Sequence, residues 1–367
     1  MLKQYKLRDY KFTLVLMVIA LTVIGILVIG SADKSEQNKQ IIGLILGLIL
    51  MVIVSLIDYV WLLQFYWFYY FIGLALLSAV ILVGRNVNGA TRWLVIGGIN
   101  LQPSDLMKII IIMFFAQYFS KHEDDLNHFK TVVLSVIIIA VPWFLIYKQP
   151  NLSTSILTLL VFCSLYFLAG LSYKIIGGIL VVLVPTVSIF FSMILKPGQT
   201  LLEEYQVMRI LAWIHPEQYP DQSAQQQNSI IAIGSGQLYG KGLETTAVES
   251  VKNGDFLAEA QTDFVFAVVG EELGFLGCCV IIILEMLIAL QCFRIGKNAR
   301  DKAGMLLGCG MGALIGLQSF MNICVATGLM PNTGLPLPFV SSGLTSLCTL
   351  FIGIGLVLNV GLQVKKY

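Results

Sequence analysis

The sequence carries little charge for its length. Asp, Glu, Lys and Arg make up only 12% of the 367 residues, whereas 57% of the residues are hydrophobic. A soluble globular chain carries about a quarter charged residues, so this composition excludes a soluble protein. It predicts a polytopic protein embedded in a membrane, and we expect no nucleic acid partner.

Histidine is scarce, and cysteine does not occur in pairs. The three histidines (His122, His128 and His215) are scattered and make no ligand cluster. The seven cysteines all fall inside apolar runs, and their number is odd. They are typical of small core residues rather than of a disulfide framework or a metal site. An internal repeat is also lacking, which disfavours an inverted-repeat transporter.

Long apolar runs dominate what remains. We expect one all-α domain over residues 1–367, with about ten transmembrane helices, because each run approaches the roughly 20 residues that a bilayer requires. The first run is long and Ser31-Ala32-Asp33 is a poor cleavage site, so we interpret it as a retained helix rather than a signal peptide. The predicted spans are residues 12–32, 40–58, 66–84, 104–120, 131–147, 152–170, 174–195, 264–293, 303–328 and 341–364.

The distribution of basic residues predicts the orientation of these spans. Lys and Arg concentrate at the N-terminus, at the C-terminus and in every second connection, including residues 294–302. By the positive-inside rule, both termini are expected in the cytoplasm. The long loop 196–262, between the seventh and eighth spans, is then extracellular.

The long extracellular loop mixes three kinds of sequence. Residues 201–214 combine apolar and charged positions, which favours a helix lying in the membrane interface, ended by His215 and Pro216. Residues 220–227 are polar and are expected to form turns. Residues 229–242 are apolar but interrupted by glycine, which suggests a short re-entrant or surface-lying element.

Two other outer segments, 86–104 and 330–343, are rich in glycine or proline. Such residues fix irregular backbone, which a membrane tolerates only where protein or a watery cavity surrounds it. Both segments are predicted on the same side as Asp263. We therefore expect them to converge there.

Three acids lie close together where the long loop meets the eighth span: Asp263, Glu271 and Glu272. A carboxylate at the lip of a membrane helix is costly to desolvate and by default suggests a functional site. The alternative is that Asp263, after Thr262, only caps the following helix. At 100° per residue, Glu271 lies about 80° from Asp263 and Glu272 lies on the opposite side, so both glutamates do not face one cavity.

A second charged pair opens the fourth span. Asp105 and Lys108 are three residues apart and share a helical face, so we expect an ion pair. The pair either closes the helix bundle structurally or lines the wall of an outward-facing cleft. Glu285, deeper in the eighth span, has no partner evident from the sequence.

Several stretches together resemble the SEDS family of bacterial membrane proteins, which includes RodA, FtsW and SpoVE. They occur in the family's order and span most of the chain, and this breadth makes the match specific. The matching stretches are Gly89–Trp93, Gln102–Lys108, Tyr205–Gln206 with Arg209–Ile210, Ile231–Gly236 with Gly240–Gly242, Thr262–Gly274 and Thr333–Ser342.

The resemblance implies a peptidoglycan glycosyltransferase that polymerises lipid II into glycan strands on the outer face of the bacterial cytoplasmic membrane. The partners implied are lipid II, the growing glycan strand and a class B penicillin-binding protein, which is a transpeptidase. The acid of the family's TDF motif corresponds to Asp263, its expected catalytic residue. A divalent cation, Mg²⁺ or Mn²⁺, is implied by the family, although no metal-ligand set is readable in the sequence.

The reaction needs a base and cations, which the sequence supplies. A sugar hydroxyl is a poor nucleophile, so a positioned carboxylate base such as Asp263 is required. Cations near a leaving pyrophosphate stabilise developing charge, and Arg92, Lys108 and Arg209 are the candidates. The further residues expected to bind substrate or support the site are Asp105, Gln206, Glu271 and Glu272.

The sequence departs from the family pattern at several positions. Asp105 replaces the usual Glu, Asn151 replaces an acid, Ser342 replaces a Tyr, and Leu344 replaces a Gly. These departures suggest a divergent member of the family, with weakened activity or altered partner choice as open alternatives. Two alternatives to polymerisation are also open. A flippase that transports lipid II would equally need a cleft and buried charges, and an inactive scaffold of a cell-wall synthesis complex is favoured by the departures. The choice among elongation, division and sporulation is not determined by the sequence.

Overall fold

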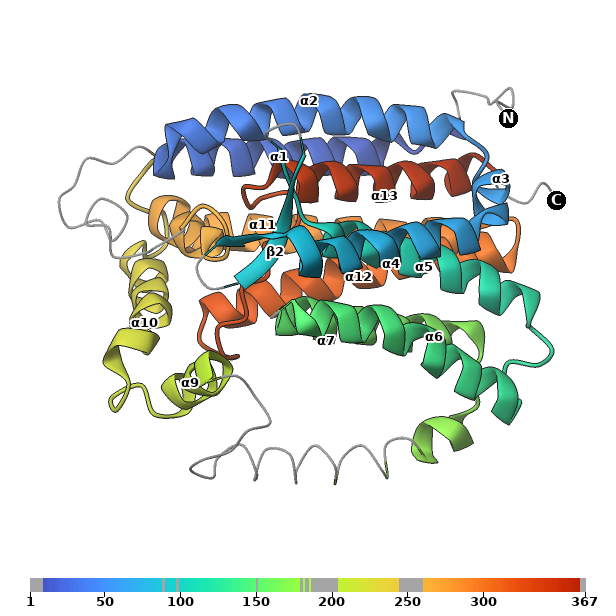
Figure 1. The fold of residues 1–367 in the computed structure, drawn as a ribbon. Coiled ribbons are helices and arrows are strands. Elements are labelled where there is room, and N and C mark those ends of the chain that lie inside the picture. Colours follow the sequence, from blue (N-terminus) through green and yellow to red (C-terminus); the bar gives the residue numbers. More distant parts are fainter. Residues whose placement is uncertain are drawn as a thin grey trace.

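The computed structural model describes residues 9–87, 90–96, 99–149, 151–178, 181, 185, 204–243 and 260–363. Its described elements are helices, with one small antiparallel sheet (Figure 1). The helices are α1 (Phe12–Ala32), α2 (Lys34–Leu56), α3 (Tyr59–Gln64), α4 (Tyr66–Val83), α5 (Pro103–Lys121), α6 (Phe129–Lys148), α7 (Leu152–Ala169), α9 (Glu204–Ile214), α10 (Pro220–Ser235), α11 (Val265–Lys297), α12 (Lys302–Ala326) and α13 (Leu344–Leu362). The strands are β1 (Arg85–Val87), β2 (Ala90–Ile96) and β3 (Ile99–Leu101).

The predicted membrane spans agree closely with these helices. Among the described residues, 8 helices are long and apolar enough to cross a membrane: α1, α2, α4, α6, α7, α11, α12 and α13. The fourth predicted span is α5, whose first two turns contain two charged residues and whose sides are almost wholly buried. The seventh predicted span, 174–195, lies largely outside the described residues.

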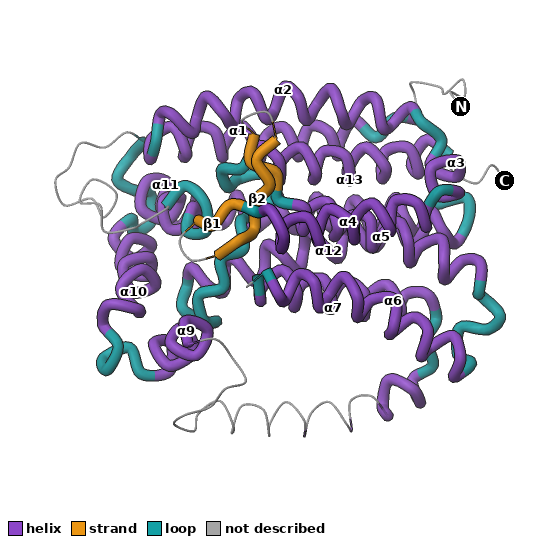
Figure 2. Tube along the Cα trace, in the orientation of Figure 1, coloured by secondary structure: helices purple, strands orange, loops and turns teal. Residues whose placement is uncertain are grey.

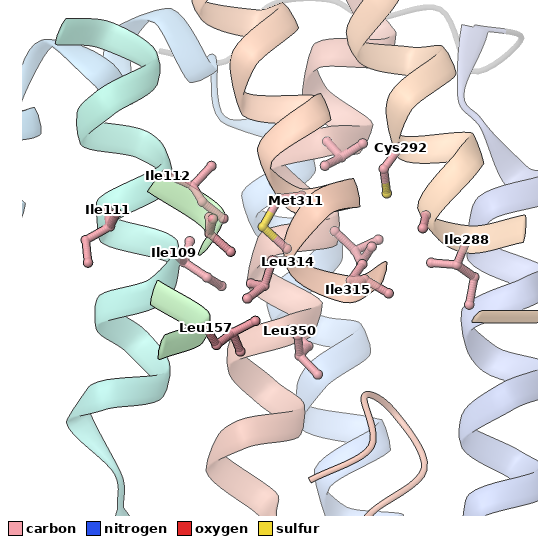
Figure 3. Packing of buried hydrophobic residues seen from close by; sticks show 14 of the residues in the cluster. Ile109, Ile111, Ile112, Leu157, Ile288, Cys292, Met311, Leu314, Ile315 and Leu350 are labelled. Carbon is pink, nitrogen blue, oxygen red and sulfur yellow. The ribbon is translucent and has the colours of Figure 1, made fainter. Parts of the chain in front are cut away.

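The core lies where α5, α11, α12 and α13 meet (Figure 3). Isoleucines of α5, among them Ile109 and Ile112, are buried together with Met311 and Leu314 of α12. A helix that is apolar all round is buried on all sides, as α5 is here. Small residues bring α11 and α12 close together, because a Cβ atom on Gly312 would lie 2.9 Å from a carbonyl oxygen of α11.

The bundle has two ends, which we name after the helices that lie there. At the α3 end, α1 begins and α13 finishes, since a Cβ atom on Gly361 would lie 3.2 Å from Lys11 Cγ. At the α10 end lie α9, α10 and the sheet (Figures 1 and 2). The assignment of the α10 end to the outside of the cell stays a prediction from the positive-inside rule.

The small sheet was not expected in an all-α chain. Its strands follow the order β1-β2-β3 and are antiparallel. Residues 90–96 (ATRWLVI) are rich in β-branched and aromatic side chains, which suit a half-buried strand. The irregular backbone predicted over 86–104 is therefore wrong for residues 86–87, 90–96 and 99–101.

The prediction of turns over residues 220–227 was also wrong, because they form the first half of α10. Pro220 occupies the first turn of the helix, where its missing N–H costs nothing. Further along, Gln226 Nε2 donates to the carbonyls of Val325 and Met330, at 2.8 and 2.6 Å. These bonds to the end of α12 hold a polar sequence helical. The helix predicted before His215 is confirmed as α9.

Candidate functional site

Helix α11 is broken near its start. Gly274 has φ 65° and ψ −164°, which interrupts the helix between a short first half, residues 265–273, and a long second half. Only glycine adopts this conformation without strain. A break inside a buried helix leaves N–H and C=O groups without intrahelical partners, and these groups need partners from elsewhere in the chain.

The segment 237–242, which follows α10, supplies those partners from its backbone. The N–H groups of Lys241 and Gly242 donate to the carbonyls of Glu271 and Glu272, at 2.9 and 3.0 Å. In return, the N–H group of Phe275 donates to the carbonyl of Gln237, at 2.8 Å. The segment therefore closes both sides of the break.

Glycine permits the close approach between this segment and α11. Gly240 has φ +81°, and a Cβ atom there would lie 2.2 Å from the carbonyl oxygen of Glu272. A Cβ atom on Gly236 would lie 1.9 Å from the carbonyl oxygen of Gly270. At Gly236 and Gly240, another backbone therefore lies where a side chain would otherwise be.

Glu271 and Glu272 contact different elements. The Lys241 Nζ atom lies 2.8 Å from Glu271 Oε1, and Glu271 is buried. On the other side of the helix, the Ser31 hydroxyl of α1 donates to Glu272. The prediction that the two carboxylates face different sides of α11 is confirmed. Both carboxylates connect the first half of α11 to its neighbours.

Asp263 stands one residue before Phe264, the N-cap residue of α11, and is partly exposed. The segment 330–343 lies against it, because a Cβ atom on Gly334 would be 3.1 Å from Asp263 Oδ2. Gly334 has φ +70°, which also favours glycine. From α12, Asn322 Nδ2 donates to the Asp263 carbonyl at 2.8 Å. Asp263 is thus held between α12 and this segment.

Segment 330–343 is fixed from several sides, by bonds that mostly reach its main chain. Gln318 Nε2 donates to the Pro336 carbonyl at 2.8 Å, and Asn322 Nδ2 donates to the Leu335 carbonyl at 2.6 Å. Ser153 of α7 donates to the Thr333 carbonyl, and Arg209 of α9 donates to the Asn332 carbonyl. The Asn332 side chain donates to Gln225 of α10. Gln40 of α2 donates to the Ser341 carbonyl, and the Ser341 hydroxyl donates to the Thr262 carbonyl.

The ion pair predicted at the start of α5 is confirmed. Lys108 Nζ lies 2.9 Å from Asp105 Oδ1, and both side chains are almost completely buried. The same Nζ atom donates to Gln318 Oε1 at 3.0 Å. Since the other end of the Gln318 amide bonds to Pro336, the pair is connected to segment 330–343. This connection was not predicted.

The remaining predicted residues belong to β2 and α9. Arg92 lies at a bulge of β2, because Arg85 pairs with Trp93 and Asn86 pairs with Thr91. Bulges re-aim side chains and are common near functional sites. Arg209 approaches the site through the Asn332 carbonyl at 3.4 Å. Gln206 belongs to α9, but its side chain lies outside the described residues.

Sequence reasoning missed Gln318 and Asn322, which make most of the bonds from α12 to the site. Their signal is a polar pair at i and i+4 inside an apolar span, where polar groups are expensive unless bonded. Lys241 was also missed as the partner of Glu271. In the described ranges, no three His, Cys, Asp or Glu side chains gather as a metal site requires. The described residues by themselves therefore supply no full ligand set for the divalent cation that the resemblance implies.

Together, the fold and the site define a polytopic membrane protein with a partly exposed acid at one end of its bundle. The sequence profile of the family described as Cell cycle protein (FTSW_RODA_SPOVE) matches residues 9–366. The chain belongs to this family.

Relatives and solved structures agree with this membership. The chain is 32% identical to "Probable peptidoglycan glycosyltransferase FtsW" of Trichlorobacter lovleyi, over 99% of this chain and 96% of the relative. It is 32% identical to the protein of the same name from Geobacter metallireducens, over 98% and 96%.

Among solved structures, one titled "Structural coordination of polymerization and crosslinking by a peptidoglycan synthase complex" has a TM-score of 0.79 and 27% identity. It covers 96% of this chain and 97% of that chain. The rod shape determining protein RodA of Thermus thermophilus has a TM-score of 0.70 and 26% identity, covering 96% of each chain.

Proposed function

We propose that this chain is a peptidoglycan glycosyltransferase that polymerises lipid II on the outer face of the cytoplasmic membrane. Membership of the family and the names of the relatives support the activity. The observation that carries the proposal is the position of Asp263. It is a partly exposed carboxylate at the mouth of a buried half-helix, with fixed main chain on two sides.

Asp263 acts as the general base of an inverting transfer. It accepts the proton of the acceptor sugar's 4-hydroxyl while the hydroxyl oxygen attacks the donor's anomeric carbon. The bond from that carbon to undecaprenyl pyrophosphate breaks, and the pyrophosphate leaves with the electron pair. The N-terminus of a helix favours negative charge, so the start of α11 stabilises ionised Asp263.

The other charged residues have supporting roles. Arg209 and Arg92 are candidates to balance the charge of the leaving pyrophosphate. Lys108 has a different role, because its ammonium is buried and already bonded to Asp105 and Gln318. It supports the site from within the protein. A class B penicillin-binding protein is the proposed partner, which would cross-link the strands that this chain makes.

The variant Asp263→Asn tests the proposal. It keeps the shape of the side chain but removes its basicity, so folding and lipid II binding survive while turnover falls at least about a hundredfold. The measurement is glycan polymer formed from lipid II by purified protein, with and without a candidate transpeptidase. Asp301→Asn is the matched control, since Asp301 caps α12 at the α3 end and should leave turnover unchanged.

Three outcomes would contradict the proposal. Near-normal polymerisation by well-folded Asp263→Asn protein would show that Asp263 only supports the start of α11. Absence of polymer from the wild-type chain under every partner condition would favour a scaffold. Movement of lipid II across vesicle membranes without polymer would favour a flippase.

A further inference from the structure

Two buried amide side chains of α12 donate hydrogen bonds to main-chain carbonyls of the candidate site. Gln318 and Asn322 are one turn apart, so their side chains lie on one face of the helix. Their relative exposures are 0% and 1%. Polar side chains at this depth in an apolar span are expensive unless their hydrogen bonds are made. The bonds they make therefore indicate what they are for.

Asn322 hydrogen-bonds to both Asp263 and segment 330–343. Its Nδ2 atom donates both to the Asp263 carbonyl, at 2.8 Å, and to the Leu335 carbonyl, at 2.6 Å. Both partners are acceptors, so the atom facing them must be the nitrogen, and the orientation of the amide is determined. One NH₂ group thus sets the spacing between Asp263 and the residue that follows Gly334.

Gln318 extends the same arrangement to the ion pair of α5. Its Oε1 atom accepts from Lys108 Nζ at 3.0 Å, and its Nε2 atom donates to the Pro336 carbonyl at 2.8 Å. A flipped amide would place NH₂ against the ammonium, so this orientation is also determined. Asp105, Lys108, Gln318 and Pro336 form one chain of bonds.

We propose that Gln318 and Asn322 are positioning residues of the transferase: they fix residues 334–336 against Asp263, with the Asp105–Lys108 pair as their buried anchor. This inference rests on the proposed function. The physical reason is that the glycine and prolines of this segment make no regular secondary structure. Side-chain bonds must therefore hold its main chain, and a shift of about 1 Å near the reacting groups can cost about a hundredfold in rate.

The test compares Asn322→Leu with Asn359→Leu. Asn359 is also a fully buried amide that makes two side-chain links between helices, but it lies at the α3 end. Both variants lose buried hydrogen bonds, so both should unfold more easily. We expect kcat per folded molecule to fall about a hundredfold for Asn322→Leu, with KM for lipid II nearly unchanged. Asn359→Leu should keep the wild-type kcat.

A second variant avoids dependence on the folding of Asn322→Leu. Gln318→Glu keeps an acceptor for Lys108 but loses the donor to Pro336, so the anchor survives and the bond to the segment does not. We expect its kcat to fall about tenfold. Equal kcat values for Gln318→Glu, Asn322→Leu and the control, after correction for folded protein, would overturn the positioning role.

Amide hydrogen exchange of residues 330–343 separates this inference from the proposed function. In both α12 variants we expect faster exchange in this segment than in the wild type, and in Asn359→Leu an unchanged rate. If the wild-type chain makes no polymer, the proposed function fails while the exchange result still stands. If the chain polymerises and exchange is unchanged in the α12 variants, only the positioning role fails.

Discussion

The two ends of the bundle are closed by different kinds of polar contact. At the α3 end, Asp58, Tyr59, Asp301, Asn359 and Gln363 bond to one another and to nearby backbone. Tyr59 donates through its hydroxyl to Asp301 and through its backbone N–H to Asn359, at 2.9 and 2.8 Å. Gln363 Nε2 donates to both Asp58 and Asn359. Short connections and a closed network of hydrogen bonds hold the helices together at this end.

The α10 end has polar capacity left over. In the described part of the chain, Asn322 Oδ1, Asn332 Oδ1 and Thr333 Oγ1 are buried atoms without a hydrogen-bond partner. No atom of the α3-end network is among such atoms. Buried polar groups are nearly always bonded, so unused ones need an explanation. The comparison teaches that the α10 end uses side-chain hydrogen bonds to hold irregular backbone, whereas the α3 end is closed by a network whose polar atoms are bonded.

The largest effect on stability is expected where the α10 end is anchored. Lys108→Ala leaves Asp105 buried without its cation, which should destabilise the protein by about 3–5 kcal/mol. The double variant with Asp105→Ala should recover folding but not polymerisation, because Gln318 then lacks its Lys108 donor. The measurements are thermal unfolding in detergent and polymer yield. Full activity of the double variant would show that the Asp105–Lys108 pair only holds helices together, as the network at the α3 end does.

A smaller effect is expected from Gly334→Ala. Its φ of +70° costs alanine about 1–3 kcal/mol, and its Cβ atom would press on Asp263 Oδ2 from 3.1 Å. We expect turnover to fall about tenfold, beyond what the loss of folded protein explains. Gly170→Ala is the control, since Gly170 has φ +109° with no heavy atom within 4 Å of its Cβ position. Equal turnover losses in Gly334→Ala and Gly170→Ala would contradict a special role for Gly334 beside Asp263.

The smallest effect is expected from Tyr59→Phe at the α3 end. Losing its hydrogen bond to Asp301 should cost about 1 kcal/mol of stability and no turnover. Burial, and then the nearby Asp301 carboxylate, raise the pKa of Tyr59 above its usual value of 10.0. The folded state therefore keeps the phenol protonated where the unfolded chain loses the proton.

The pH dependence follows from the sign of that shift. A raised pKa in the folded state gives stability that is present below about pH 10 and is lost as the pH rises further. The difference in unfolding temperature between wild type and Tyr59→Phe should shrink above that pH. A difference that stays constant would contradict the role of the buried hydroxyl. Turnover at neutral pH should be equal in both proteins.

Much of the fold was predictable because a bilayer makes hydropathy decisive. Spans such as 12–32 and 303–328 match α1 and α12 within two residues. The first half of α10 was not predictable from local sequence, because its polar residues are held by carbonyls at the end of α12. Local propensity does not report such distant partners.

The candidate site was predictable in part, for a related reason. The i,i+3 spacing determined the Asp105–Lys108 pair, since both residues belong to one helix. The catalytic assignment of Asp263 stays a prediction, resting on its position and on the family. The partners Gln318, Asn322 and Lys241 come from elements far apart in the sequence. Only the fold shows which of the many polar residues meet.

The break in α11 also bears on how the chain is made. The segment 237–242, which satisfies both sides of the break, precedes α11 in the sequence, and synthesis proceeds from the N-terminus. Its amide and carbonyl groups are therefore already outside the ribosome when Gly274 emerges. A discontinuous helix that entered lipid first would expose unsatisfied backbone to hydrocarbon. The order of elements along this chain lets the helix meet its cap as it enters the membrane.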